Sequence, residues 1–193
     1  MNDLQNIKLP IALQPILEDT ASLGFTMSSD IQTGCLLRTL AATKPQGRFL
    51  ELGTGTGCGT AWILEGIDAH STLDTVDINS DTTAVAQKHL ATDKRIAFHL
   101  TDGVEFLQSA QGKTYDFIFA DTWAGKYERF DLALNLLNGG GILVFDDILP
   151  QASWPEDHFP KVANLLSSLD AMTDYWVVKM NWSTGIVIIT KGV

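Results

Sequence analysis

The stretch FLELGTGTGCGT, residues 49–60, runs from apolar residues into four glycines that alternate with small residues. The apolar part predicts a buried β-strand, and the residues after Gly57 predict the start of a helix. Glycine lets the backbone adopt a positive φ and leaves no Cβ between the chain and a ligand. In an open α/β sheet, the turn after the first strand opens on the crevice beyond the carboxyl ends of the strands. The stretch therefore predicts a ligand-binding turn at that edge.

Short apolar runs alternate with helical patterns after this stretch. Strands are expected at residues 48–52, 72–78, 95–100, 115–120 and 141–145, with helices between them near residues 58–66, 82–91, 103–109 and 128–137. Strands that are apolar at successive positions are covered on both faces, and strands linked by helices lie parallel. We therefore expect a Rossmann-like, doubly wound α/β fold with a mostly parallel sheet.

The two ends of the chain differ from this pattern. Two helices are expected before the first strand, at residues 9–23 and 29–42, the second capped by Ser28 or Ser29. After a helix at residues 158–170, two apolar runs flank the sequence NWST and predict an antiparallel hairpin, which completes a seven-stranded sheet. We expect one domain, residues 1–193, in which residues 1–45 form a helical lid or packing layer.

Composition narrows the classes of partner. The 193 residues are 45% hydrophobic and carry a formal net charge of −10, which repels nucleic acid and anionic membranes. The two cysteines form no CxxC pair, so neither a disulfide framework nor a zinc cluster is indicated. The N-terminus does not resemble a signal peptide, and no apolar run reaches the roughly 18 residues of a membrane helix. We expect a cytoplasmic protein that binds neither nucleic acid nor membranes.

The spacing of the glycines separates two classes of cofactor. The dinucleotide fingerprint G-x-G-x-x-G fits no register, because Cys58, Thr60 or Trp62 stands where the third glycine is needed. The pattern present, E-x-G-x-G-x-G, resembles the first motif of the class I S-adenosylmethionine-dependent methyltransferases. That resemblance implies that the segment packs against the methionine part of the cofactor, through Glu51, Gly53, Thr54, Gly55 and Gly57. A tight turn that holds no ligand is the alternative interpretation.

Two acidic residues follow the next strands. Asp77 ends the second strand, where a carboxylate can accept hydrogen bonds from both hydroxyls of a ribose, in NAD as well as in S-adenosylmethionine. Ile78 lies next to it. Asp102 and Gly103 follow the third strand, and in the methyltransferase family an acidic residue there faces the adenine amine. Either carboxylate could instead cap a helix or be hydrated at the surface of a loop.

Residues 115–149 resemble the core of the cation-dependent O-methyltransferases, the catechol and caffeoyl-CoA group, and the resemblance extends over the chain from about residue 27. It implies that Asp121, Asp146 and Asp147 bind Mg²⁺ or another divalent cation, for which oxygen ligands are suited. It also implies that Asp121, which adjoins the cofactor as well, or Lys126 removes a proton. This sequence departs from the family pattern at two positions, which counts against these roles. Lys126 is farther from Asp121 than in the family, and Asp147 replaces an asparagine. The two aspartates could instead cap the following loop, as in metal-free relatives.

We therefore expect an enzyme that transfers methyl from S-adenosylmethionine to a hydroxyl oxygen of a small molecule, aromatic or not, with or without a metal. Trp123 and Trp154 could wall the acceptor, and His158 is the histidine nearest to this loop region. The resemblance is also compatible with a homodimer. Three alternatives stay open: a metal-independent methyltransferase with another small-molecule acceptor, a nicotinamide-dependent oxidoreductase, and a cofactor-binding module without catalysis.

Overall fold

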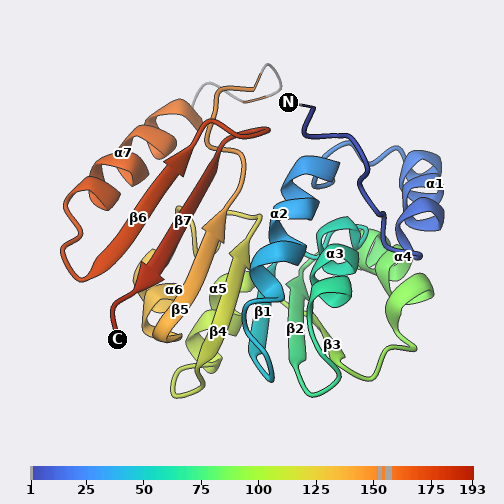
Figure 1. Cartoon of the computed structure of the whole chain (residues 1–193), viewed down its shortest axis with the longest axis horizontal. Helices are drawn as coiled ribbons and strands as arrows, with labels where there is room; N and C mark the ends of the chain where they lie inside the picture. Colours follow the sequence, from blue (N-terminus) through green and yellow to red (C-terminus); the bar gives the residue numbers. More distant parts are fainter. Residues whose placement is uncertain (1, 152–153, 155–157) are drawn as a thin grey trace.

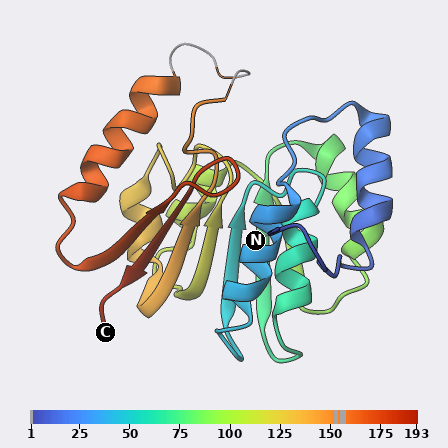
Figure 2. The same cartoon turned by 45° about the horizontal axis from the view of Figure 1, so that its top comes forward.

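A computed structural model describes residues 2–151, 154 and 158–193 (Figures 1 and 2). Its centre is a seven-stranded sheet with the strand order β3-β2-β1-β4-β5-β7-β6. The strands are β1 (Arg48–Leu52), β2 (Thr72–Asp77), β3 (Ile96–Leu100), β4 (Tyr115–Ala120), β5 (Leu137–Phe145), β6 (Tyr175–Met180) and β7 (Ile186–Lys191). Strands β1 to β5 run parallel to one another. Strand β7 pairs antiparallel with both β5 and β6. The expected doubly wound sheet with a C-terminal hairpin is confirmed.

The helices cover both faces of this sheet (Figure 1). They are α1 (Leu13–Leu23), α2 (Ile31–Ala41), α3 (Cys58–Gly66), α4 (Ser80–Leu90), α5 (Gly103–Ser109), α6 (Phe130–Asn135) and α7 (His158–Asp170). Helices α1 to α4 pack on one face and α5 to α7 on the other, in two separate clusters of buried apolar side chains. Successive side chains of a strand point to opposite faces of the sheet, so Phe49 of β1 belongs to the first cluster and Leu50 to the second.

This topology fixes where a ligand can bind. The sheet order reverses between β1 and β4, because β2 and β3 extend to one side of β1 while β4 and β5 extend to the other. In open α/β sheets the binding crevice lies at this switch point, outside the carboxyl ends of the strands. Gly53 follows β1 and Asp121 follows β4, so the structure places both predicted site residues at this point.

Several expected boundaries were wrong. Helix α1 begins at Leu13 instead of residue 9. The N-cap of α2 is Asp30, whose Oδ1 accepts hydrogen bonds from the backbone N–H groups of Gln32 and Thr33, at 2.6 and 3.1 Å. Helix α4 begins at Ser80 because Asn79 caps it. Helix α6 is shorter than residues 128–137, because β5 already begins at Leu137 and includes the three glycines that follow. Among the described residues, no helix has the length and apolar character that a bilayer span requires.

Candidate functional site

The loop of residues 53–57 joins β1 to α3 and contains three glycines with positive φ. At Gly57 (φ 93°) an added Cβ would lie 2.8 Å from the Cβ of Ala86 in α4, so the helices could not pack as they do. At Gly55 (φ 51°) the nearest atoms to such a Cβ belong to the ring of Phe25, at 3.5 Å. Gly57 is therefore required for packing, whereas a Cβ at Gly55 would make only an ordinary van der Waals contact with the Phe25 ring.

Asp77 connects the glycine loop to the end of β2. Its Oδ2 accepts a hydrogen bond from the Gly55 backbone N–H at 2.7 Å, and its Oδ1 accepts one from the Asn79 N–H at 2.8 Å. Ile78, the next residue, is 70% exposed although it is a large apolar side chain. The structure thus brings together a fixed carboxylate, the glycine loop and an exposed apolar side chain at the carboxyl ends of the strands.

Asp102 is the N-cap of α5. Its Oδ1 accepts hydrogen bonds from the backbone N–H groups of Val104 and Glu105, at 2.8 and 3.1 Å, as the helix-cap interpretation predicts. Gly103 packs closely as well, because a Cβ there would lie 2.6 Å from the Cβ of Ala124. Both residues lie at the same edge as Asp77, and each has a structural role that does not depend on a ligand.

Glu51 lies beneath the loop and is fully buried. Its Oε2 accepts hydrogen bonds from the hydroxyls of Thr60 and Thr75, at 2.5 and 2.6 Å, and Thr75 in turn lies 2.6 Å from the hydroxyl of Thr54. Within the described part of the chain, Glu51 Oε1 has no hydrogen-bond partner. Burial raises the pKa of Glu51 to about 7, and the charge of Asp77 adds to the effect. Glu51 therefore supports the loop from below.

Asp121 follows β4 at the switch point and is partly buried. Its Oδ2 accepts a hydrogen bond from the hydroxyl of Ser29 at 3.0 Å. Burial raises the pKa of Asp121 well above its ordinary value, the negative charge of Asp146 raises it further, and the ammonium of Lys126 opposes the shift. Asp121 is thus a carboxyl group with increased proton affinity at the edge where a ligand would bind.

Lys126 reaches this cluster in spite of its distance from Asp121 in the sequence. Only 4% of it is exposed, and its Nζ donates a hydrogen bond to the backbone carbonyl of Asp146 at 2.9 Å. Burial lowers the pKa of Lys126, while the charges of Asp121, Asp147 and Asp146 act in the opposite direction. The longer spacing therefore does not remove Lys126 from the carboxylate cluster, because the loop after β4 folds back.

Asp146 and Asp147 directly follow β5. Asp146 is 3% exposed, and its Oδ1 accepts hydrogen bonds from the Asp147 N–H at 2.7 Å and from the hydroxyl of Thr184. Asp147 has a φ of 56°, a conformation that is uncommon outside glycine. Across the described residues, no three His, Cys, Asp or Glu side chains are grouped as metal ligands. The three predicted ligands Asp121, Asp146 and Asp147 therefore do not form such a group.

Aromatic side chains gather beyond β4 and β5. The ring of Trp154 stacks on that of His158 with centroids 4.1 Å apart, and Tyr127 Oη lies 3.1 Å from His158 Nε2. Trp123 makes an edge contact with both Tyr127 and His158 and is 40% exposed. The two tryptophans expected to wall an acceptor thus lie in one cluster with His158.

Sequence reasoning missed two hydroxyl groups that bind the carboxylates, Ser29 on Asp121 and Thr184 on Asp146. Ser29 was considered only as a helix cap. The two residues are 92 and 38 positions from their partners, so no local pattern could have indicated the contacts. Each depends on how α2 and the turn after β6 pack on the sheet.

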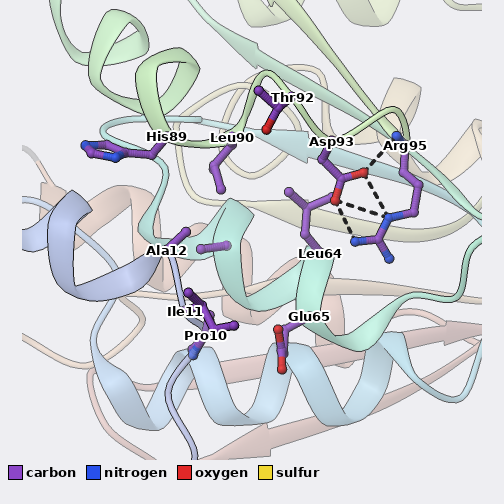
Figure 3. Close-up of a pocket in the computed structure, with 11 residues that line it drawn as sticks. Pro10, Ile11, Ala12, Leu64, Glu65, His89, Leu90, Thr92, Asp93 and Arg95 are labelled. Atoms are coloured by element: carbon purple, nitrogen blue, oxygen red, sulfur yellow. Dashed lines mark hydrogen bonds and ion pairs between the residues drawn. The ribbon is translucent and has the colours of Figure 1, made fainter.

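A cavity of about 220 Å³ lies away from all these residues (Figure 3). It is bordered by Pro10 and Ile11, by the end of α3, and by the segment after α4. At one end Arg95 Nη2 donates a hydrogen bond to Asp93 Oδ2 at 2.6 Å, so the charges of this pair compensate each other. The cavity contains none of the predicted site residues, and we assign it no function.

The fold and the carboxyl-edge site define an α/β protein of the nucleoside-cofactor-binding type. Residues 50–148 match the family described as "Methyltransferase domain". This chain belongs to that methyltransferase domain family.

Individual proteins that resemble this chain include methyltransferases. The chain is 33% identical over 127 residues to the O-methyltransferase hkm8 of Aspergillus hancockii, a match that covers 62% of this chain and 49% of the relative. The chain thus spans about half the length of this curated relative.

Two solved structures share the fold at low sequence identity. One is the O-methyltransferase TomG of Streptomyces achromogenes in complex with S-adenosylmethionine (TM-score 0.84, 19% identity, covering 98% of this chain and 93% of that one). The other is the O-methyltransferase of Bacillus cereus in complex with S-adenosylhomocysteine (TM-score 0.84, 16% identity, covering 98% and 94%).

Proposed function

We propose that this protein transfers a methyl group from S-adenosylmethionine to a hydroxyl oxygen of a small molecule. The observation that carries the proposal is the hydrogen bond from the Gly55 N–H to Asp77, which joins the glycine turn to the end of β2 beside the switch point of the sheet. Family membership, a curated relative named as an O-methyltransferase, and the complex of TomG with S-adenosylmethionine support it.

The residues of this edge suit the parts of that cofactor. The loop Gly53–Gly57, which is held by Thr75 through its contacts with Glu51 and Thr54, would support the methionine part. Asp77 would accept hydrogen bonds from the ribose hydroxyls, and the exposed side chain of Ile78 would cover one face of the adenine. Asp102 and Gly103 would lie beside the adenine rim. When bound, the cofactor supplies a methyl group already activated by its sulfonium charge.

The chain must then place the acceptor and remove one proton. We assign proton removal to Asp121, because burial and Asp146 raise its proton affinity and Ser29 fixes the orientation of its carboxylate. Lys126 would balance the negative charge that develops on the acceptor oxygen, since its ammonium is buried among three aspartates. Trp123 and Trp154, with His158, would wall the side of the acceptor toward β5.

Replacing Asp121 by Asn tests this assignment. We expect turnover to fall by about 100-fold or more, the usual contribution of general-base catalysis. Affinity for S-adenosylhomocysteine in calorimetry should stay within about fivefold, a loss below about 1 kcal/mol, since Asn keeps the shape of Asp and this ligand carries no sulfonium charge for the carboxylate to contact. The exposed Asp131, replaced by Asn, serves as the matched control and should change neither quantity. Unchanged turnover in the Asp121 variant would remove Asp121 from the mechanism.

A divalent cation is a separate proposal, based on the resemblance of Asp121, Asp146 and Asp147 to the ligands of the cation-dependent enzymes. Among the described residues no three such side chains are grouped as metal ligands, and Asp146 has only its Oδ2 available, because Thr184 and the Asp147 N–H both bind its Oδ1. We therefore assign no step to a cation. EDTA, followed by Mg²⁺, in a working assay decides the question: loss and recovery of activity would establish a cation, and constant activity would establish the metal-independent alternative.

We further propose that residues 1–193 act as a single cytoplasmic domain, that residues 1–45 cover the active edge, and that the partner is a small molecule. Support comes from α1 and α2, which share one apolar cluster with the sheet, and from the charge of −10, which disfavours nucleic acid and anionic membranes. A homodimer follows only from the resemblance. Sedimentation at micromolar concentration tests it, and a monomer there would contradict it.

Calorimetry distinguishes the remaining alternatives. Binding of S-adenosylmethionine and S-adenosylhomocysteine without NAD supports the methyltransferase, whereas binding of NAD alone would favour a nicotinamide-dependent oxidoreductase. A binding module without catalysis would bind the sulfur compounds but methylate no acceptor in a broad panel of hydroxy compounds. The retained cluster of Asp121, Lys126 and Asp146 argues against such a module, because cofactor binding alone does not require it.

A further inference from the structure

A second cavity, of about 530 Å³, lies between α1, the beginning of α2 and the turn after β6. Figure 1 shows the N-terminal segment passing between α1 and α2, and Leu4 of that segment borders the cavity. Its apolar part is formed by Leu13, Leu17, Ile31 and Trp62. A cavity of this size and lining is typical of sites for small organic ligands.

The polar end of this cavity adjoins the proposed methyl-transfer residues. Ser29 lines the cavity, and its hydroxyl donates the hydrogen bond to Asp121. Thr184 also lines it, and its hydroxyl donates a hydrogen bond to Asp146. Each of the two carboxylates is therefore separated from the cavity by one small hydroxyl side chain. A molecule with its apolar body in the cavity would have its polar end at this boundary.

The charges at that end select among acceptors. Asp30 lines the cavity, and its carboxylate accepts hydrogen bonds from two backbone N–H groups and from the hydroxyls of Thr33 and Ser183. Within the described part of the chain, no Lys or Arg lines the cavity. A negative group beside the acceptor hydroxyl would meet the carboxylate of Asp30 without a Lys or Arg in the described lining to offset it, and the net charge of −10 adds to the repulsion.

We propose that this cavity holds the body of the methyl acceptor, and that the acceptor is an uncharged or cationic hydroxy compound with an apolar body. The proposal rests on the proposed function and specifies its substrate class. It excludes acceptors that carry a carboxylate or phosphate next to the hydroxyl.

Three naphthalene probes test the class of acceptor: 2-naphthol, its cationic derivative 1-(aminomethyl)-2-naphthol, and the anionic 3-hydroxy-2-naphthoate. Each is titrated into the full chain by calorimetry, with and without saturating S-adenosylhomocysteine. We expect the neutral and cationic probes to bind at least about threefold to tenfold more tightly than the anionic one, the ratio for one charge pair partly screened by water. Failure of all three to bind, or tightest binding of the anion, would overturn the proposal.

Two variants of α1 test the location. Leu17→Trp fills the cavity, and we expect 2-naphthol affinity to fall by about tenfold or more, as for a ligand whose apolar pocket is occupied. Leu23→Trp places the same side chain on the same helix at a 44% exposed position outside the cavity, and should bind 2-naphthol as the natural chain does. Equal binding by both variants would place the probe elsewhere and overturn the proposal. Thermal unfolding of both variants identifies a loss that is due to misfolding.

Asp30→Asn tests the charge separately. Asn is as good an N-cap as Asp, so α2 should keep its start while the charge is removed. We expect the preference for the neutral over the anionic probe to shrink about threefold, in line with one removed charge. An unchanged preference would refute the role of Asp30.

Binding of S-adenosylhomocysteine to the natural chain separates the two levels of argument. If it does not bind, the proposed function fails, while the comparison of Leu17→Trp with Leu23→Trp still shows whether the cavity holds the probe.

Discussion

At the scale of single residues, Glu51 is an ionisable group whose raised pKa is caused mainly by burial. It is fully buried beneath the glycine loop, with two threonine hydroxyls on one oxygen, and its pKa is raised from 4.5 to about 7. Between these values the folded state binds a proton that the unfolded state has lost. The stability contributed by this group therefore falls as the pH rises from about 4.5 to about 7, by about 3 kcal/mol in total.

Replacing Glu51 by Gln should remove this pH dependence. The amide cannot ionise, and Thr60 and Thr75 can rotate to donate to its oxygen or accept from its nitrogen. We expect the variant to gain stability relative to the natural chain as the pH rises from 5 to 8, measured as the free energy of unfolding in urea at both values. The exposed Glu65, replaced by Gln, should show no such trend. A constant difference between the natural chain and the Glu51 variant would show that Glu51 does not titrate in this range.

At the scale of elements, the turn between β1 and α3 separates packing from binding. Gly57→Ala would force a Cβ to within 2.8 Å of Ala86 at a φ of 93°, so we expect a loss of about 2–4 kcal/mol in unfolding free energy from overpacking and strain. Gly55→Ala meets only the Phe25 ring at 3.5 Å, and its loss should be about 1–2 kcal/mol, the cost of the left-handed conformation.

Cofactor affinity should respond more strongly at Gly55, because the added methyl group would lie on the side of the loop, toward Phe25, where the ligand is proposed to bind. Calorimetry with S-adenosylhomocysteine at a temperature where both variants are folded provides the measurement. If Gly55→Ala binds as tightly as the natural chain, the space above Gly55 is not the cofactor site.

The same elements show what the sequence could predict. All seven strands were expected, because their residues are apolar on both faces and the turns between them are polar. The N-cap of α2 was not predicted correctly, because Ser28, Ser29 and Asp30 can all cap a helix. Tertiary contacts decide among them, because Ser183 binds Asp30 and Asp121 binds Ser29. In the site, Asp77 and the glycines could be predicted because they lie at the ends of neighbouring strands, whereas the hydroxyl partners of Asp121 and Asp146 come from distant segments.

At the scale of the whole molecule, the proposed cofactor would contact loops that follow β1, β2, β3 and β4. Ligand binding to the folded state alone adds RT ln(1 + [L]/Kd) to the free energy of unfolding, about 2.7 kcal/mol at a concentration of 100 Kd. For a chain of this length, such a gain raises the melting temperature by roughly 5–10 °C. We expect S-adenosylmethionine to produce this shift and NAD to produce none.

Replacing Asp77 by Ala should reduce the shift. The variant loses the proposed ribose contact and also the bond to the Gly55 N–H, so its melting temperature without ligand should fall as well. Asp81→Ala, an exposed change in the first turn of the neighbouring helix α4, serves as the control and should keep the full shift. The shift is compared at equal ligand concentration and relative to each variant's own melting temperature. If the Asp77 variant keeps a full shift, the nucleoside is not held by the end of β2, and the assignment of this edge would have to be revised.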